Sequence, residues 1–394
     1  TVRYELWQLP DDQPGGPYPD QNFPGASLVF SRYNDQDDTL HLLTGPEFLR
    51  TDSYWLYTRI KKARPGQTKL RLYLSKYNAM PNMAPVFFWS TDQRHWQRAT
   101  LLEPSTGAGL FQPLLTAPAE DFYLSSSLPF LDLEREELCR QAAALPYINQ
   151  EIIGHSVAGN PITMLTATDL TVPPASKQDI LIIIGQHSPQ EMIGGHAILP
   201  LLTELANQPG LLQRLALHIV PTVNVDAAAY GSNGANLNLF NTNRCWFENP
   251  QPETEAIKSW CLREPRRLLL FFDWHAGGVW RNHTLLWFNR EVKNTYAPNT
   301  AERLEQRQQT VFELLGRHCG IRPEDSVEHP FRNFCATDWF LVNFPECLPL
   351  TLEFSTCRNF DPRLGHTVPV SQDTIAMIGR QLAVVLQELI AAKT

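Results

Sequence analysis

Residues 179–191 read Asp-Ile-Leu-Ile-Ile-Ile-Gly-Gln-His-Ser-Pro-Gln-Glu, an apolar run followed at once by polar residues. From Ile180 to Ile184 the run has no polar side chain, as expected for a strand buried on both faces of a sheet. In open α/β sheets, ligand sites lie where such strands end and loops begin. His187 and Glu191 stand at that place, so the stretch predicts both an α/β fold and a site at the end of its first strand.

The sequence after residue 127 continues this alternation of strands and helices. Further buried strands are expected at residues 215–226, 266–275 and 349–355, with helices at 128–145, after the first strand, and at 370–393. The last helix has apolar residues at helical spacing, which is typical of a helix packed on a core. Residues 127–394 therefore predict an α/β domain with a mixed or parallel sheet flanked by helices.

The first 126 residues follow a different pattern. Leu70, Leu72 and Leu74 alternate with the charged Lys69 and Arg71, and this period of two predicts a half-buried antiparallel strand. Similar strand-like runs occur at residues 26–33, 53–60, 84–91 and 120–127, with turn-forming residues between them. Residues 1–126 therefore predict an all-β sandwich domain in front of the α/β domain.

Composition excludes some classes of function. The 394 residues carry a net charge of −8, which disfavours a general nucleic-acid binder. We find no apolar run long enough for a membrane span, so no membrane partner is expected. The seven cysteines are an odd number without CxxC spacing, which predicts free thiols and a cytoplasmic protein rather than a disulfide framework or a thiolate zinc site.

Two more expected strand ends carry polar residues. Asp273 and His275 follow a buried strand directly, and Glu353 lies inside the apolar run of residues 349–355. Two imidazoles and a carboxylate from separate strand ends, His187, His275 and Glu191, are the ligand set of an open catalytic zinc site, whose fourth position is left for water. Glu353 could then act as the general base toward that water, and Asp273 could orient a ligand imidazole.

Each of these residues also has an ordinary structural explanation. A single histidine after a strand is more often a hydrogen-bonded loop residue than a ligand, and this chain has eleven histidines. Glu191 could be an acidic residue at a helix N-terminus, where the helix dipole favours it. Glu353 is harder to explain in this way, because a carboxylate in an apolar strand needs a partner. The ordered set is therefore more specific than any one member.

Taken together, these residues resemble the zinc carboxypeptidase superfamily, which is carboxypeptidase A-like, and within it the cytosolic carboxypeptidase branch. That branch carries a β-sandwich domain before its catalytic domain, in the order found here. The resemblance extends over nearly the whole chain and is carried by these segments: residues 84–98, 152–169, 186–191, 224–226, 243–246, 273–275 and 351–353. It implies a carboxypeptidase-like mixed sheet and a metallocarboxypeptidase that uses one zinc ion.

The resemblance also implies roles for individual residues. His187, Glu191 and His275 would bind the zinc, and Glu353 would be the catalytic base. Arg244, helped by Asn243, would hold the terminal carboxylate of a peptide or protein substrate. A guanidinium fork suits a carboxylate because it forms two parallel charge-assisted hydrogen bonds. In an alternative alignment, Arg244 corresponds to a different arginine of the family. The separation between Asn224 and Arg244, and the presence of Trp246 two residues later, favour the alignment in which Arg244 holds the substrate carboxylate.

The chain departs from the family pattern at several positions. Ser188, Pro189 and Gln190 put three residues between His187 and Glu191 where the family has two, so we expect the loop to bulge. The Gly that ends the family's Asn-Pro-Asp-Gly turn is Ala227 here. A second arginine near Gly234 and a tyrosine near Phe340 or Leu341 are also missing, and Arg281 is one possible substitute for that arginine.

Three functions stay open on the sequence alone. The first is a metallocarboxypeptidase. The second is a zinc amidohydrolase that deacylates acyl-amino acids, which would share the metal site and the arginine. The third is a catalytically weak binding protein on the same fold. The N-terminal sandwich and the segment Asn243–Trp246 favour the carboxypeptidase.

Overall fold

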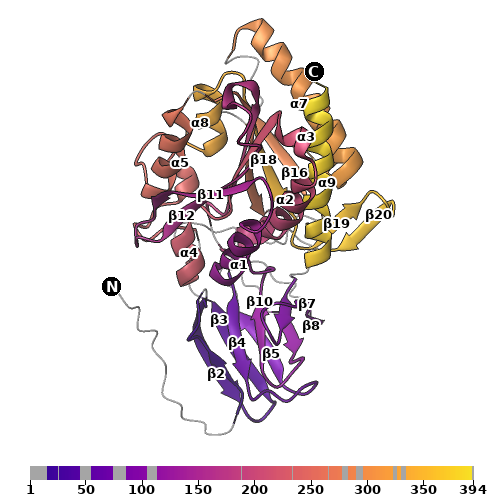
Figure 1. Cartoon of the computed structure of the whole chain (residues 1–394). Helices are drawn as coiled ribbons and strands as arrows, with labels where there is room; N and C mark the ends of the chain where they lie inside the picture. Colours follow the sequence, from indigo (N-terminus) through magenta and orange to yellow (C-terminus); the bar gives the residue numbers. More distant parts are fainter. Residues whose placement is uncertain are drawn as a thin grey trace.

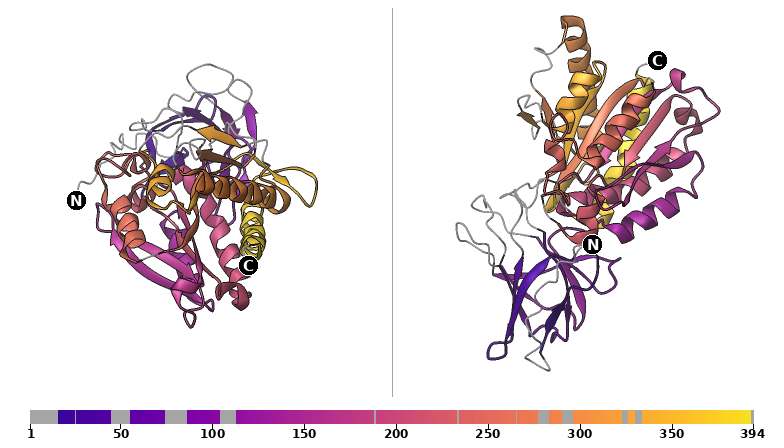
Figure 2. Two further views of the ribbon diagram at one scale, coloured as in Figure 1. Left: turned by 90° about the horizontal axis from the view of Figure 1, so that it is seen from above. Right: turned by 90° about the vertical axis from the view of Figure 1, so that its left-hand side faces the viewer.

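The computed structural model describes residues 16–24, 26–44, 55–73, 86–103, 113–187, 189–232, 234–264, 266–276, 283–289, 296–322, 326–329 and 334–392. They form two parts, an all-β part from the N-terminal third and an α/β part from the rest, which lie one below the other in Figure 1. The side view in Figure 2 shows the same arrangement.

The N-terminal part consists of two five-stranded sheets. The first has the order β1 (Tyr18–Asp20), β4 (Tyr57–Lys61), β10 (Phe122–Ser125), β6 (Phe88–Ser90) and β7 (Gln97–Arg98). The second has the order β2 (Leu28–Asn34), β3 (Thr39–Thr44), β5 (Lys69–Tyr73), β9 (Leu114–Thr116) and β8 (Leu101–Glu103). Leu70 and Leu72 are fully buried, as their alternation with charged residues predicts; Leu74 lies outside the described residues.

The C-terminal part is built on an eight-stranded mixed sheet. Its strands lie in the order β11 (Ile148–His155), β12 (Pro161–Ala167), β14 (Leu215–Val220), β13 (Gln178–Ile184), β15 (Leu268–Ala276), β18 (Leu348–Phe354), β16 (Leu285–Asn289) and β17 (Val327–His329). The four central strands β14, β13, β15 and β18 are parallel to their neighbours in this group, so their carboxyl ends meet at one edge of the sheet. The expected mixed sheet is confirmed.

Helices cover both faces of this sheet (Figure 1). The helices are α1 (Asp132–Ala142), α2 (Ile198–Ala206), α3 (Pro209–Leu212), α4 (Val225–Tyr230), α5 (Pro252–Arg263), α7 (Pro298–Cys319), α8 (Ala336–Asn343) and α9 (Gln372–Ala391). Short 3-10 helices are η1 (Pro174–Ser176), η2 (Pro189–Ala197) and η3 (Thr242–Arg244), and β19 (Arg358–Asp361) and β20 (His366–Pro369) form a separate hairpin. Helices α2, α7 and α9 share one apolar core, and α5 and α8 share another.

Two expectations about individual elements are corrected. The strand expected at residues 215–226 ends at Val220, because the side chain of Asn224 accepts a hydrogen bond from the Ala227 amide and begins α4. Helix α9 also qualifies, by length and composition alone, as a candidate membrane span, although no apolar run of that length was expected. It packs against α2 and α7 and 56% of its apolar window is buried, as in the core helix of a folded domain.

The two parts share an apolar core. One continuous cluster of buried side chains contains Leu56 and Leu124 of the sandwich, Phe130 of the connecting segment, and Ile193 of η2. The chain passes from one part to the other between Ser125 and Asp132. That residues 1–126 and 127–394 fold as separate domains stays a prediction.

Candidate metal centre

Three of the predicted site residues, His187, His275 and Glu353, lie at the carboxyl ends of the parallel strands β13, β15 and β18. Strand β13 ends at Ile184 and leads through Gly185 into the segment that carries His187. Gly185 has a φ of 71°, a left-handed conformation, and a Cβ there would lie 2.7 Å from the Met192 side chain. Only glycine adopts this conformation without strain, so it turns the chain sharply from the strand into the site.

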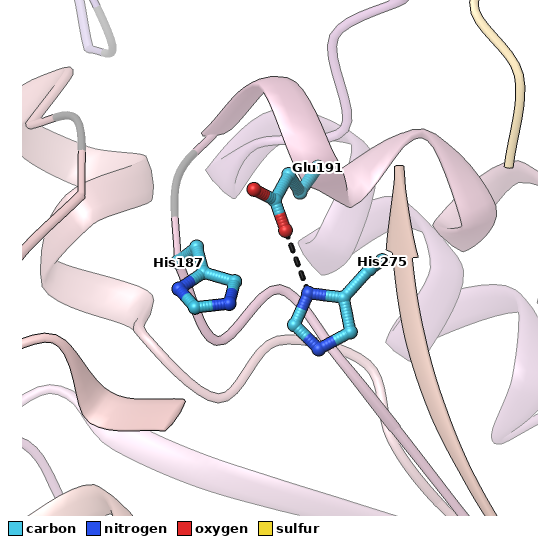
Figure 3. Close-up of side chains that lie close together, drawn as sticks. All are labelled: His187, Glu191 and His275. Carbon is cyan, nitrogen blue, oxygen red and sulfur yellow. Dashed lines mark hydrogen bonds and ion pairs between the residues drawn. The ribbon is translucent and has the colours of Figure 1, made fainter. Parts of the chain in front are cut away.

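His187, Glu191 and His275 lie together at this edge. One possible ligand atom from each residue lies within 4.8 Å of the others, and all three residues are at least 96% buried. Figure 3 shows the side chains pointing toward one another, with Glu191 from η2 and His275 from β15. The three-residue spacing between His187 and Glu191 therefore does not separate them; Ser188 itself lies outside the described residues.

His275 is held between two buried carboxylates. Its Nδ1 lies 2.6 Å from Glu191 Oε2, and its Nε2 lies 2.8 Å from Asp273 Oδ2. Burial alone would lower the pKa of His275, but the negative charges and hydrogen bonds of Asp273 and Glu191 raise this pKa well above its ordinary value. The two carboxylates thus make the centre of the cluster electrically negative, which favours a bound cation in place of the proton.

A hydrogen-bonded chain that the sequence analysis did not single out supports Asp273 from behind. Trp246 Nε1 donates to Gln186 Oε1 over 2.7 Å, and Gln186 Nε2 donates to Asp273 Oδ1 over 2.7 Å. Thr242 Oγ1 donates to the Gln186 carbonyl. Gln186 is fully buried. Its position in the sequence, between an apolar strand and the predicted ligand His187, was the one feature that could have indicated its role. The chain links Trp246, two residues after Arg244, to the imidazole of His275.

Asn243 lies directly against the two histidines. Its Nδ2 is 3.2 Å from His187 Nε2 and 3.3 Å from His275 Nε2, and its Oδ1 accepts a hydrogen bond from the Ala336 amide. The amide is buried beside the imidazoles in this structure. Its predicted help in binding a substrate carboxylate stays a prediction.

Arg244, the next residue, is exposed. Its guanidinium carbon lies 4.7 Å from the centre of the Phe334 ring, and its Nη1 donates to the Asn243 carbonyl over 3.3 Å. A short 3-10 helix, η3, thus presents a buried amide to the imidazoles and the next residue, a guanidinium, to solvent at the rim of the site.

Glu353 is placed beside His275 by the register of the sheet. Strands β15 and β18 are parallel, and the Cα atoms of His275 and Glu353 are directly paired. Side chains at paired positions of adjacent strands lie on the same face of a sheet. Glu353 is half-buried, whereas His187, Glu191 and His275 are buried.

The tyrosine hydroxyl that the family pattern places near Phe340 or Leu341 is absent at both of these positions. Phe340 and Leu341 are fully buried, and the Phe340 ring stacks on Phe271 with centroids 3.8 Å apart. They are apolar residues packed in the core and offer no hydroxyl to the site. Arg281 lies outside the described residues. The Gly234 amide donates to the His187 carbonyl over 3.2 Å, which ties the loop after α4 to the site.

Comparison with known proteins agrees with this architecture. Residues 137–251 match the family model described as zinc carboxypeptidase, which confirms the resemblance over that part of the chain. The fold is similar to a metallo-carboxypeptidase from Burkholderia cenocepacia, with a TM-score of 0.79, 19% sequence identity, and coverage of 96% of this chain and 100% of that chain.

A second solved structure covers the same two parts. It is a metallo-carboxypeptidase from Pseudomonas aeruginosa in complex with (2-guanidinoethylmercapto)succinic acid, with a TM-score of 0.74, 20% identity, and coverage of 94% of this chain and 100% of that chain. Because both matches extend over nearly the whole chain, the sandwich is part of the shared architecture. The expected fold class is thereby confirmed.

Proposed function

Since the chain has the fold of the metallo-carboxypeptidases and residues 137–251 match the zinc carboxypeptidase family, we propose that it is a zinc-dependent metallocarboxypeptidase. Its substrate is the C-terminal peptide bond of a peptide or protein. The observation that carries the proposal is the convergence of His187, Glu191 and His275 from two strand ends and one 3-10 helix.

The donor set fits a zinc ion. Two imidazoles and one carboxylate are the preferred ligands of catalytic zinc, and their atoms are close enough for one ion to reach all three with small side-chain movements. The carboxylates of Glu191 and Asp273 place negative charge beside His275, which favours a bound cation at this point. When bound, the ion would polarise the scissile carbonyl and lower the pKa of a bound water to about 7.

Glu353 is the proposed general base and acid. Its carboxylate takes a proton from the attacking water and delivers it to the nitrogen of the leaving amine. Its pairing with His275 across β15 and β18 supports this role, because both side chains lie on one face at the same level of the sheet. Half-burial leaves the carboxylate accessible to water.

Arg244 is the proposed anchor for the substrate's terminal carboxylate. Its exposure supports the proposal, as does its position next to Asn243, whose amide touches both imidazoles. Stacking on Phe334 orients the plane of the guanidinium. The Pseudomonas structure contains a succinic acid derivative, which carries two carboxylates, so this compound is a suitable probe for the same anchor.

The experiment measures zinc content and then product formation from a peptide library. We expect one zinc ion per chain and the release of single amino acids from free C-termini. Peptides with an amidated C-terminus should resist cleavage, because the carboxylate that Arg244 holds is missing. Glu353→Gln protein, prepared in parallel, is the control for contaminating peptidases.

Two results would reject the proposal in favour of the other functions. Zinc-loaded protein that leaves all peptides intact but releases a fatty or other acyl group from acyl-amino acids would be an amidohydrolase. Zinc-loaded protein that cleaves neither class would be a binding protein. The apolar Phe340 and Leu341, near the position where the family has a tyrosine, give the last outcome a physical basis.

A further inference from the structure

The segment that carries Glu191 is an unusual support for a metal ligand. It is a 3-10 helix, η2, which extends over nine residues from Pro189 to Ala197. Runs of 3-10 helix longer than three or four residues are uncommon, because their hydrogen-bond geometry is poorer than that of an α-helix. A ligand on such a segment depends on contacts from outside the helix to keep its position.

The connecting segment between the two parts supplies three of those contacts. Ser127 Oγ donates to the Gln190 carbonyl over 3.1 Å, and both residues are fully buried. His196 Nε2 lies 2.8 Å from the Pro129 carbonyl. A Cβ on Gly195 would lie 2.2 Å from the Phe130 ring, so the ring packs directly on the η2 backbone.

The same segment is fixed to the sandwich at its other end. Ser126 N donates to the Leu56 carbonyl over 3.0 Å, and Leu56 N donates to Ser126 Oγ over 3.1 Å. Leu56 directly precedes strand β4, whose neighbour β10 ends at Ser125. Two consecutive serines thus join the sandwich to the carbonyl of Gln190, the residue just before Glu191.

We propose that residues 126–130 are a brace through which the sandwich positions the metal-binding carboxylate of Glu191, with Ser127 as its positioning residue. The proposal rests on the proposed function for the identity of the metal, but not for the brace itself. In this way the N-terminal part contributes to the metal centre. The brace holds η2 in place in the metal-free protein, so that less conformational entropy is lost when the ion binds. Ser127 touches neither ion nor substrate and acts through Gln190.

The test compares Ser127→Ala with Ser90→Ala in the full-length protein. Ser90 is an equally buried serine of the sandwich whose hydroxyl bonds to Asp92, and no hydrogen bond described for it reaches η2. Hydrogen exchange of the metal-free proteins reports on the brace, and Zn²⁺ affinity by competition with a chelator reports on the ligand. Thermal unfolding of both variants shows how much general stability each has lost.

We expect Ser127→Ala to speed the exchange of amides in residues 190–197 and to weaken Zn²⁺ binding by about tenfold, the lower end for groups that support metal ligands from behind. Ser90→Ala should change neither, even where it lowers the melting temperature. Unchanged exchange in residues 190–197 would overturn the brace. Faster exchange with unchanged Zn²⁺ affinity would overturn the positioning role.

Two further measurements separate this proposal from the proposed function. If Ser127→Ala does not fold, the wild-type protein alone still tests the brace. In that protein, Zn²⁺ binding should slow hydrogen exchange at residues 126–130 as well as in η2. Protection confined to η2 would contradict the brace. A protein that binds Zn²⁺ and shows the brace, but cleaves no peptide, would reject only the carboxypeptidase activity.

Discussion

At the scale of single residues, the centre concentrates buried polar groups that satisfy one another. His275 contacts Glu191 and Asp273, and Asp273 in turn accepts from Gln186. A buried carboxylate is costly without such partners. The network therefore fixes the orientation of the imidazole in the folded protein, before any metal or substrate is bound.

Replacing Glu353 by Gln should separate metal binding from chemistry. The amide keeps the size of the side chain but cannot accept a proton, so peptide cleavage should fall by about 10²- to 10⁴-fold. Zinc content should stay at the wild-type level, because Glu353 is not among the three clustered residues. Peptide turnover and metal analysis on the same preparation check this, and undiminished cleavage would remove Glu353 from its role.

Replacing Arg244 by Lys tests the anchor for the substrate carboxylate. A lysine keeps the charge but not the planar fork, so kcat/KM for a free C-terminus should fall roughly 10- to 100-fold, the loss of a charge-assisted hydrogen bond. The matched peptide amide, cleaved poorly by both proteins, should show no further loss. A uniform loss on both substrates would point to a folding defect instead.

At the scale of elements, η2 contains a histidine whose protonation opposes folding. His196 is half-buried against Phe130, and burial lowers its pKa from 6.5 to about 4, although the hydrogen bond to the Pro129 carbonyl acts in the opposite direction. In the unfolded chain the same imidazole binds a proton below its ordinary pKa. The unfolded state therefore holds more protons between these two values.

The free energy of unfolding should consequently fall as the pH is lowered through this window. The contribution of His196 is fully present above pH 6.5 and is lost toward pH 4, by at most about 3 kcal/mol at ~1.4 kcal/mol per pKa unit. His196→Gln keeps a donor for Pro129 but cannot titrate, so its stability should depend less on pH. Urea unfolding of both proteins at pH 7 and pH 5 is the measurement; equal losses would assign the effect to other groups.

At the scale of the whole molecule, the sandwich and the α/β part share one apolar cluster and a set of polar contacts. Arg98 Nη1 donates to the Cys357 carbonyl over 2.6 Å, and Gln372 Nε2 donates to the Arg94 carbonyl over 3.0 Å. These bonds join the sandwich to the start of α9 and the turn before β19. The two parts therefore have a common interior rather than a loose linker.

Zinc should raise the melting temperature of the whole molecule in one step. An ion at a hundredfold excess over its Kd adds about 2.7 kcal/mol to the folded state, which corresponds to a rise of a few degrees for a chain of this size. Calorimetry with Zn²⁺ and after chelation checks this, with His275→Ala as the control that should not respond. Two separate transitions, only one of which moves, would show that the sandwich unfolds independently.

Much of the fold could be predicted from the sequence because its signals are local. The apolar run of β13 and the alternating Leu70 and Leu72 of β5 reflect burial on two faces and on one face of a sheet. The helix start at Asn224 was missed, since an asparagine cap competes with an apolar pattern that also suits a strand. The helix expected at residues 370–393 is confirmed as α9, because its apolar residues repeat at helical spacing.

The side chains at the strand ends could be identified from the order of the amino acids alone, since parallel strands bring their carboxyl ends to one edge. How they meet became visible in the folded chain: Glu191 reaches His275 despite the added residue, Asn243 contacts the imidazoles while Arg244 is exposed, and Ser127 donates a hydrogen bond to η2. The physical reason is distance along the chain. Hydrogen bonds between residues that are tens of positions apart leave no periodic or local trace, so they exist only once the core has fixed both partners in space.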